Sequence, residues 1–218
     1  SLTAGQSIVL FIASSPAEVD LDLFLYDDLR TQIDAAMGTG SQESLITPSD
    51  GEYFIEVRAV DSASNYNLSI GQITPAGMVD TLRLSDEFVP GEAIVILEDG
   101  ASSAMISSSL AGQPRILGMQ VKAGAAGRGM LLGFDEETDR QQALRTLGIR
   151  RSLVNGRIHQ TADPDQKYKM DTLWIVKSMR RQFGVRSAQP NFIRKVQAIP
   201  NDPLFNRQWH YPLINLPQ

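Results

Sequence analysis

The sequence predicts an all-β domain over residues 1–73, followed by a linker over 74–86 and an α+β domain over 87–198. Apolar residues of the first part alternate with period two, as in strands that bury one face. The strongest helical pattern lies in the second part, at 171–183. The 218 residues are enough for two small domains, and a hydrophobic content of 42% is ordinary for a folded chain.

Short strands separated by turns make up the predicted first domain. An apolar run at 7–12 has the length of a strand, and three later segments alternate. The alternating apolar positions are Leu21, Leu23 and Leu25, then Tyr53, Ile55 and Val57, then Tyr66, Leu68 and Ile70. Turn-forming residues lie at 14–16, 38–41 and 48–51. Many short strands at this spacing predict a β-sandwich.

The predicted second domain mixes strands and helices. In chain order we expect a strand at 88–97, a helix at 102–111, strands at 115–121 and 129–134, helices at 136–147 and 171–183, and a strand at 185–196. Pro190 places the last strand at a sheet edge or makes it irregular. The order strand, helix, strand, strand, helix, strand is the split βαβ, or ferredoxin-like, pattern.

The helix expected at 171–183 has recognisable ends. Asp171 or Met170 would begin it, since an acidic residue suits the N-terminal end of a helix. Gly184 would follow as its C-cap. Its apolar face would consist of Ile175, Val176, Met179 and Phe183.

Three segments of the first domain carry a family pattern. Residues 20–25, 51–57 and 65–70 read DLDLFL, GEYFIEV and NYNLSI. In this order and spacing they resemble the bacterial pre-peptidase C-terminal domain, over about a third of the chain. The resemblance implies a small jelly-roll-like sandwich that is attached to a secreted peptidase.

Three segments of the second domain resemble the propeptide of subtilisin-like proteases. They are FVPGE at 88–92, DTL at 171–173 and SAQPNF at 187–192, which includes the motif residues Pro190 and Asn191. Gln189 stands where that family usually has glutamate, so this chain has no carboxylate at that position. The stretch 136–168 is longer than the minimal propeptide and is expected to be an insertion.

The end of the chain carries a third resemblance. Pro200, Asn201, Asp202 and Pro203, with Trp209 shortly after, are similar to the first residues of the catalytic domain of bacterial subtilisin-like serine proteases. We therefore expect 199–218 to be the start of a catalytic domain that is otherwise missing. The sequence contexts of the catalytic aspartate, histidine and serine do not occur in this sequence, so no catalytic residue is predicted in it.

The segment between the two resemblances is the predicted inhibitory tail and processing region. It consists of Arg194, Lys195, Val196, Gln197, Ala198 and Ile199. In zymogens of this family such a tail lies in the substrate cleft as an added strand. The resemblance implies an intramolecular chaperone and inhibitor whose partner is the cognate catalytic domain, in a secreted or periplasmic bacterial protein. The alternatives are an interdomain linker for the tail, and a binding module or a free-standing inhibitor for the chain.

Composition indicates few other ligands. The net charge of −5 argues against nucleic acid, and no apolar run is long enough to span a membrane. Zinc is not expected, because the chain has no cysteine and only two separated histidines, His159 and His210. Asp20 and Asp22 are weak candidates for calcium, although a solvated strand face is the simpler interpretation. No other cofactor is predicted.

Overall fold

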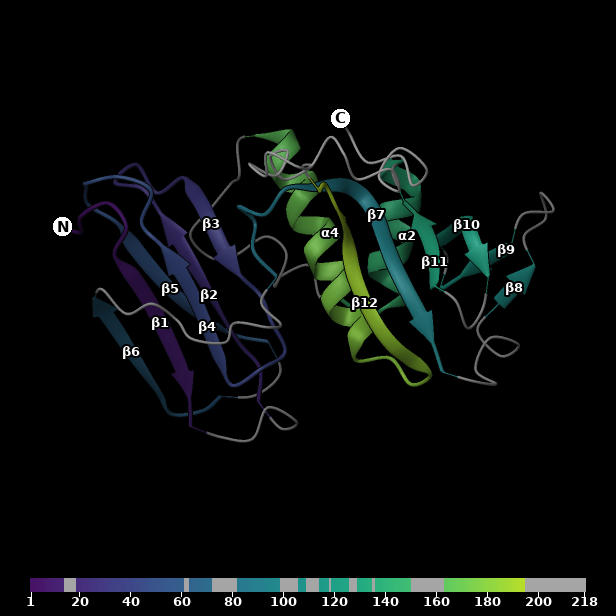
Figure 1. The fold of residues 1–218 in the computed structure, drawn as a ribbon, viewed down its shortest axis with the longest axis horizontal. Coiled ribbons are helices and arrows are strands. Elements are labelled where there is room, and N and C mark those ends of the chain that lie inside the picture. Colours follow the sequence, from purple (N-terminus) through teal and green to yellow (C-terminus); the bar gives the residue numbers. More distant parts are fainter. Residues whose placement is uncertain are drawn as a thin grey trace, which may run out of the picture.

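The computed structural model describes residues 1–13, 19–60, 63–71, 82–98, 106–108, 114–117, 119–125, 129–134, 136–149 and 163–194. These residues form mainly antiparallel β-sheets, together with two helices (Figure 1). The β-rich character that the sequence predicts is therefore confirmed. No helix within these ranges is long and apolar enough to cross a membrane.

Two facing sheets form the first part. Its strands are β1 (Ser7–Ile12), β2 (Leu21–Tyr26), β3 (Gln32–Ala36), β4 (Gln42–Ile46), β5 (Phe54–Ala59) and β6 (Tyr66–Gly71). They make two three-stranded sheets with the orders β4-β1-β6 and β3-β2-β5. Ile8 and Leu10 of β1 share one buried cluster with Leu21, Leu23 and Leu25 of β2, so the sheets pack face to face. The alternation predicted for β2 is confirmed.

The edge strand β6 leaves its apolar row partly uncovered. Pairing with β1 puts Tyr66, Leu68 and Ile70 on the same side of the sheet as the buried residues of β1. Their exposed fractions are nevertheless 49%, 38% and 48%. β6 is the last strand of its sheet, and its apolar row is only partly covered.

A larger sheet forms the second part. Its strands are β7 (Phe88–Leu97), β8 (Ile106–Ser108), β9 (Pro114–Ile116), β10 (Met119–Ala125), β11 (Gly129–Gly133) and β12 (Val185–Phe192). The sheet order is β12-β7-β11-β10-β9-β8, and every neighbouring pair is antiparallel. β12 lies at the edge, and the register shifts between Pro190 and Asn191. The prediction that Pro190 marks an edge strand or an irregularity is therefore confirmed.

One face of this sheet packs against α2 (Glu137–Thr146) and α4 (Pro164–Arg180). The strands contribute Ala93, Val95, Met130, Leu132 and Ala188 to this core, and the helices contribute Ala143, Leu144, Leu173, Ile175, Val176 and Met179. Both helices lie between β11 and β12 in the chain. The expected helix at 136–147 is confirmed with slightly shorter bounds.

The helix expected at 102–111 is wrong where the structure describes it. Residues Ile106–Ser108 form β8, which pairs with β9. A β-branched residue followed by two serines has low helix propensity, and pairing with a neighbouring strand decides the outcome. The predicted alternation of strands and helices therefore differs from the observed order, in which four strands follow β7 before the first described helix.

Both ends of the helix expected at 171–183 are also wrong. α4 begins at Pro164, because Asp163 caps it by accepting a hydrogen bond from the Asp165 N–H and proline suits the first turn. Its C-cap is Arg181 rather than Gly184. Phe183 lies beyond the helix and is 95% exposed, so it is not part of the apolar face.

The described end of the stretch expected to be a linker is packed against the first part. The Met37 N–H donates to the Leu82 carbonyl at 2.8 Å, and the Leu84 N–H donates to the Ala35 carbonyl at 3.0 Å. Leu82 and Leu84 are buried. Residues 82–86 therefore connect the two parts through fixed contacts.

Candidate functional site

Helix α4 is covered on two sides, which makes it the joint between the two parts of the chain. Figure 1 shows it between the sheet that contains β7 and β12 and the strands of the first part. Residues 170–177 are all buried, as expected for a helix that has protein on both sides. Phe24 and Tyr26 of β2 belong to the same hydrophobic cluster as Trp174.

Polar contacts from α4 to the first part run along the helix. Gln166 donates through Nε2 to the Gln32 carbonyl at 2.5 Å. Lys169 donates to the carbonyls of Leu84 at 2.6 Å and Asp86 at 3.0 Å. Burial lowers the pKa of Lys169, and nearby carboxylates oppose this shift. These contacts fix the helix relative to β3 and to residues 82–86.

A buried charge cluster lies at the other end of this joint. The Lys177 ammonium donates to Asp20 Oδ1 at 2.8 Å and to Asp22 Oδ1. Arg181 lies 3.3 Å from Asp20 Oδ2. Lys177, Asp20 and Asp22 are 1%, 4% and 0% exposed. The interpretation of the two aspartates as a solvated strand face is therefore wrong, because they face α4.

The same contacts bear on the calcium candidates. The Lys177 ammonium stands beside both carboxylates and supplies the positive charge that a cation would bring. Within the described ranges there is no group of three or more His, Asp or Glu side chains arranged to hold a metal ion. The observed geometry is that of a buried ion pair rather than of an oxygen cage.

Burial dominates the electrostatics of the cluster. It raises the pKa of Asp22, and Lys177 opposes this rise. For Lys177, burial alone would lower the pKa, but Asp22 and Asp20 together raise it above its ordinary value. Neither Asp22 Oδ2 nor the two carboxylate oxygens of Glu43 has a hydrogen bond of normal geometry within the described residues. Burial, followed by the charge of Asp22, raises the pKa of Glu43 to about 8.

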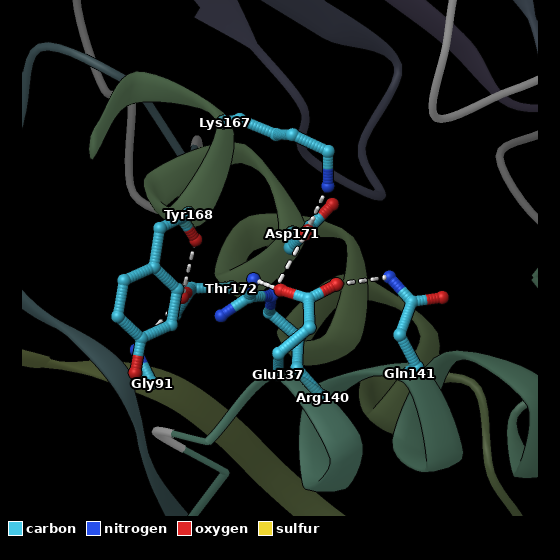
Figure 2. A network of polar contacts seen from close by, with 8 residues as sticks. All are labelled: Gly91, Glu137, Arg140, Gln141, Lys167, Tyr168, Asp171 and Thr172. Carbon is cyan, nitrogen blue, oxygen red and sulfur yellow. Dashed lines mark hydrogen bonds and ion pairs between the residues drawn. The ribbon is translucent and has the colours of Figure 1, made fainter. Parts of the chain in front are cut away.

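A second charged network holds α2 against α4 (Figure 2). The buried carboxylate of Asp171 accepts hydrogen bonds at 2.9 Å from Arg140 Nε and from Lys167 Nζ. Arg140 also pairs with Glu137, and its guanidinium lies 4.4 Å from the centre of the Tyr168 ring. Asp171, expected at the start of a helix, is thus an internal anchor for α2.

The segments that resemble a protease propeptide meet in space. The Gly91 N–H donates to Thr172 Oγ1 at 2.9 Å, although 81 residues separate them (Figure 2). Asn191 Nδ2 donates to Glu92 Oε2 at 2.7 Å, and Lys122 Nζ lies 3.0 Å from Glu92 Oε1. Residues from 88–92, 171–173 and 187–192 therefore form one contact region around the first half of β7.

The second face of the large sheet differs from the face that the helices cover. The register places Ile94 of β7 beside Leu131 of β11 and Gln189 of β12 on this face. Ile94, Ile96 and Leu131 are only half-buried, whereas Ala93 and Val95 on the helix side are fully buried. We call this surface, formed by Glu92, Ile94, Ile96, Lys122, Leu131, Gln189 and Asn191, the open face.

The predicted site residues are only partly within the described chain. Pro190 and Asn191 lie on β12, and Arg194 is the last described residue of the predicted tail. Lys195, Val196, Gln197, Ala198 and Ile199 lie outside the described residues, as do Pro200, Asn201, Asp202, Pro203 and Trp209. The two histidines, His159 and His210, also lie outside them.

Sequence reasoning missed Lys177 and Glu43. Lys177 directly follows the apolar run 173–176, which is an unusual place for an exposed lysine. Glu43 lies two residues before Leu45 in β4, so period two puts both on the buried side. Both signals were readable, but their partners come from distant parts of the chain.

The chain was compared with known protein families, with curated proteins and with solved structures. It matches none of them.

Proposed function

We propose that this chain is the non-catalytic pro-region of a secreted subtilisin-like serine endopeptidase. It would act as the intramolecular chaperone and inhibitor of the cognate catalytic domain. The proposal starts from the resemblances at 88–92, 171–173, 187–192 and 200–209. The first three of these segments contribute residues to one contact region, which supports the view that they belong to one folded unit.

We also propose a fold for each of the two parts. The two facing three-stranded sheets support a small jelly-roll-like sandwich for the first part. For the second part, β12 lies beside β7, and β11 separates β7 from β10. This order, with the last strand next to the first, supports a ferredoxin-like propeptide domain, in which β8 and β9 are the described strands between β7 and β10.

The open face is the observation that carries the proposed function. Helices cover one side of the sheet, while Ile94, Ile96 and Leu131 remain half-buried on the other. Gly129 and Gly133 of β11 carry no side chain, and the Lys122 side chain lies over Gly133. An apolar sheet surface that has the hydrogen-bonded side chains of Glu92 and Asn191 at its end suits a flat partner surface. The catalytic domain would dock there.

The edge position of β12 supports the second half of the mechanism. β12 ends at Phe192, and the chain continues directly to Arg194 and the predicted tail. A chain that leaves an edge strand in extended form can be added as a strand to the substrate cleft. Docking through the open face would place the tail beside the cleft, where it excludes substrate until the tail is cut.

We predict that this chain inhibits a subtilisin-type enzyme and that the open face is required. Ile94→Asp and Leu131→Asp should each raise the inhibition constant by roughly 30-fold, equivalent to about 2 kcal/mol for a central apolar contact. Both positions face away from the helices but are half-buried on strands, so the unfolding transition of each variant is measured alongside inhibition. The measurement is inhibition of peptide hydrolysis by the full chain at several concentrations.

Phe183→Asp is the matched control, because it places the same charge at an apolar residue that is 95% exposed and outside the open face. It should inhibit as the unsubstituted chain does. Equal inhibition by the chains with Ile94→Asp and Phe183→Asp would contradict docking through the open face. Absence of inhibition by the unsubstituted chain, tested with the cognate catalytic domain too, would contradict the proposed function.

One observation favours a second candidate function, a peptide-binding module in the first part. The edge strand β6 contains no charged residue, and its apolar row of Tyr66, Leu68 and Ile70 is more than one-third exposed. An extended apolar peptide could add as a strand at this edge. Leu68→Lys should then abolish peptide binding in calorimetry and leave inhibition unchanged. Asn67→Lys, at the neighbouring position on the opposite side of the strand, is the control that should still bind.

A further inference from the structure

The charge cluster at the joint contains more carboxylates than its nearest cations can neutralise. Asp20, Asp22 and Glu43 come from the first part, whereas Lys177 and Arg181 come from α4. Arg58, the remaining cation near Asp22, is engaged by Glu56 at 3.0 Å. Arg83 donates a hydrogen bond to Oγ of Ser44, a residue of β4, at 3.3 Å. With Asp20 and Asp22 ionised, Lys177 and Arg181 balance them, and an ionised Glu43 would add a third negative charge.

Glu43 is poorly placed to carry that charge. It is fully buried, and no hydrogen bond of normal geometry reaches either carboxylate oxygen within the described residues. Glu43 lies opposite Leu10 of β1, whose side chain belongs to the apolar cluster between the two sheets of the first part. The Gly38 N–H and the Lys177 charge favour the anion, but burial outweighs them, so the neutral acid of Glu43 is less costly than the anion. Asp22 Oδ2 is also buried and accepts no hydrogen bond of normal geometry within the described residues.

We propose that the docking of the first part onto α4 is a pH-dependent contact, tight in mildly acidic solution and weaker above neutral pH. Glu43 and Asp22 are the groups that release it. Once Asp22 is ionised, loss of the Glu43 proton adds a third negative charge that Lys177 and Arg181 do not balance in a buried site. The inference does not depend on the proposed function.

The direction follows from linkage between proton binding and folding. The pKa of Glu43 rises from its ordinary value of 4.5 to about 8 in the folded chain. Between these two values the folded state therefore holds a proton that a solvated Glu43 carboxyl group would release. Stability from this group is fully present below pH 4.5, falls as the pH rises and reaches its minimum above pH 8. Asp22, whose pKa burial also raises, acts in the same direction.

Trp174 offers a direct reporter for the joint. Its ring is buried between the two parts and lies 5.8 Å from the Lys177 ammonium. The chain has two tryptophans, so Trp209→Phe leaves Trp174 as the single fluorophore. Quenching of its fluorescence by acrylamide measures how often the joint opens, at each pH from 5 to 9.

In this background, quenching should increase with pH, with its midpoint near 8. Glu43→Gln should flatten the upper part of the profile. Asp22→Asn should move the midpoint to lower pH, because the charge of Asp22 helps to raise the pKa of Glu43. Asp139→Asn is the control, because Asp139 pairs with Arg115 at 3.2 Å in the second part, and it should keep the original profile.

Constant quenching from pH 5 to 9 in the unsubstituted background would overturn the proposal. A Glu43→Gln profile that coincides with the original would do the same. If Glu43→Gln does not fold, Asp22→Asn decides, because an unchanged midpoint in that variant contradicts the coupling between the two carboxylates.

Discussion

Lys177→Met should lower the free energy of unfolding by about 3–5 kcal/mol at neutral pH, since it leaves buried carboxylates without their cation. Methionine keeps most of the side-chain length, so the loss reports mainly on charge. Asp20 and Asp22 both contact the Lys177 ammonium and are almost completely buried. Arg181 pairs with Asp20 at 3.3 Å and its side chain is 37% exposed, so it is a weaker cation for this cluster than the buried lysine. Urea unfolding followed by circular dichroism measures the effect.

Lys167→Met is the matched control for this substitution. Lys167 also lies on α4 and pairs with a buried carboxylate, Asp171, but its side chain is 42% exposed and Arg140 remains as a second partner. Its loss should cost about 1 kcal/mol or less. Adding Asp22→Asn to Lys177→Met should recover part of the lost stability, because the two residues are coupled. Equal losses in the two lysine variants would contradict a special role for Lys177.

Trp174→Ala should lower the free energy of unfolding by about 3–5 kcal/mol through the cavity that it leaves. The ring is 1% exposed and belongs to the cluster that joins β2 to α4. This burial is that of a packing residue rather than of an exposed recognition residue. The same urea titration measures the loss.

The expected loss for Trp174 also has a matched comparison. Phe183→Ala removes an aromatic ring of similar kind three residues beyond the end of α4, where it is 95% exposed. It should change the free energy of unfolding by no more than about 0.5 kcal/mol. A similar loss in both variants would show that Trp174 does not fill a cavity at the joint.

Local sequence patterns were sufficient for most strands. The leucines at 21, 23 and 25 alternate because one side of β2 faces the other sheet, and this can be read from two-residue periodicity. Pro190 also indicated an edge strand from its missing N–H alone. The true start of α4 was readable from Asp163 and Pro164, but the apolar stripe further along the helix drew the predicted boundary toward Asp171.

The contact between the two parts could not be predicted in the same way. Asp20 and Asp22 occupy the polar positions of an alternating strand, which normally face water. They are buried because α4 covers that side of the sheet, and 157 residues separate Asp20 from Lys177. One sequence gives no information about pairing over such a distance. The open face was likewise invisible, because half-buried Ile94 and buried Val95 have similar side chains.

The distance between β2 and α4 has a consequence for protein synthesis. A ribosome adds roughly 5–20 residues per second, so the 157 residues between Asp20 and Lys177 take roughly 8–30 s to appear. During that time the side of β2 that carries Phe24 and Tyr26 has no helix to cover it. Asp20 and Asp22 flank this aromatic surface and would then be ionised in water. The carboxylates that are costly to bury in the folded protein would thus oppose aggregation of the nascent chain, as gatekeeper residues do.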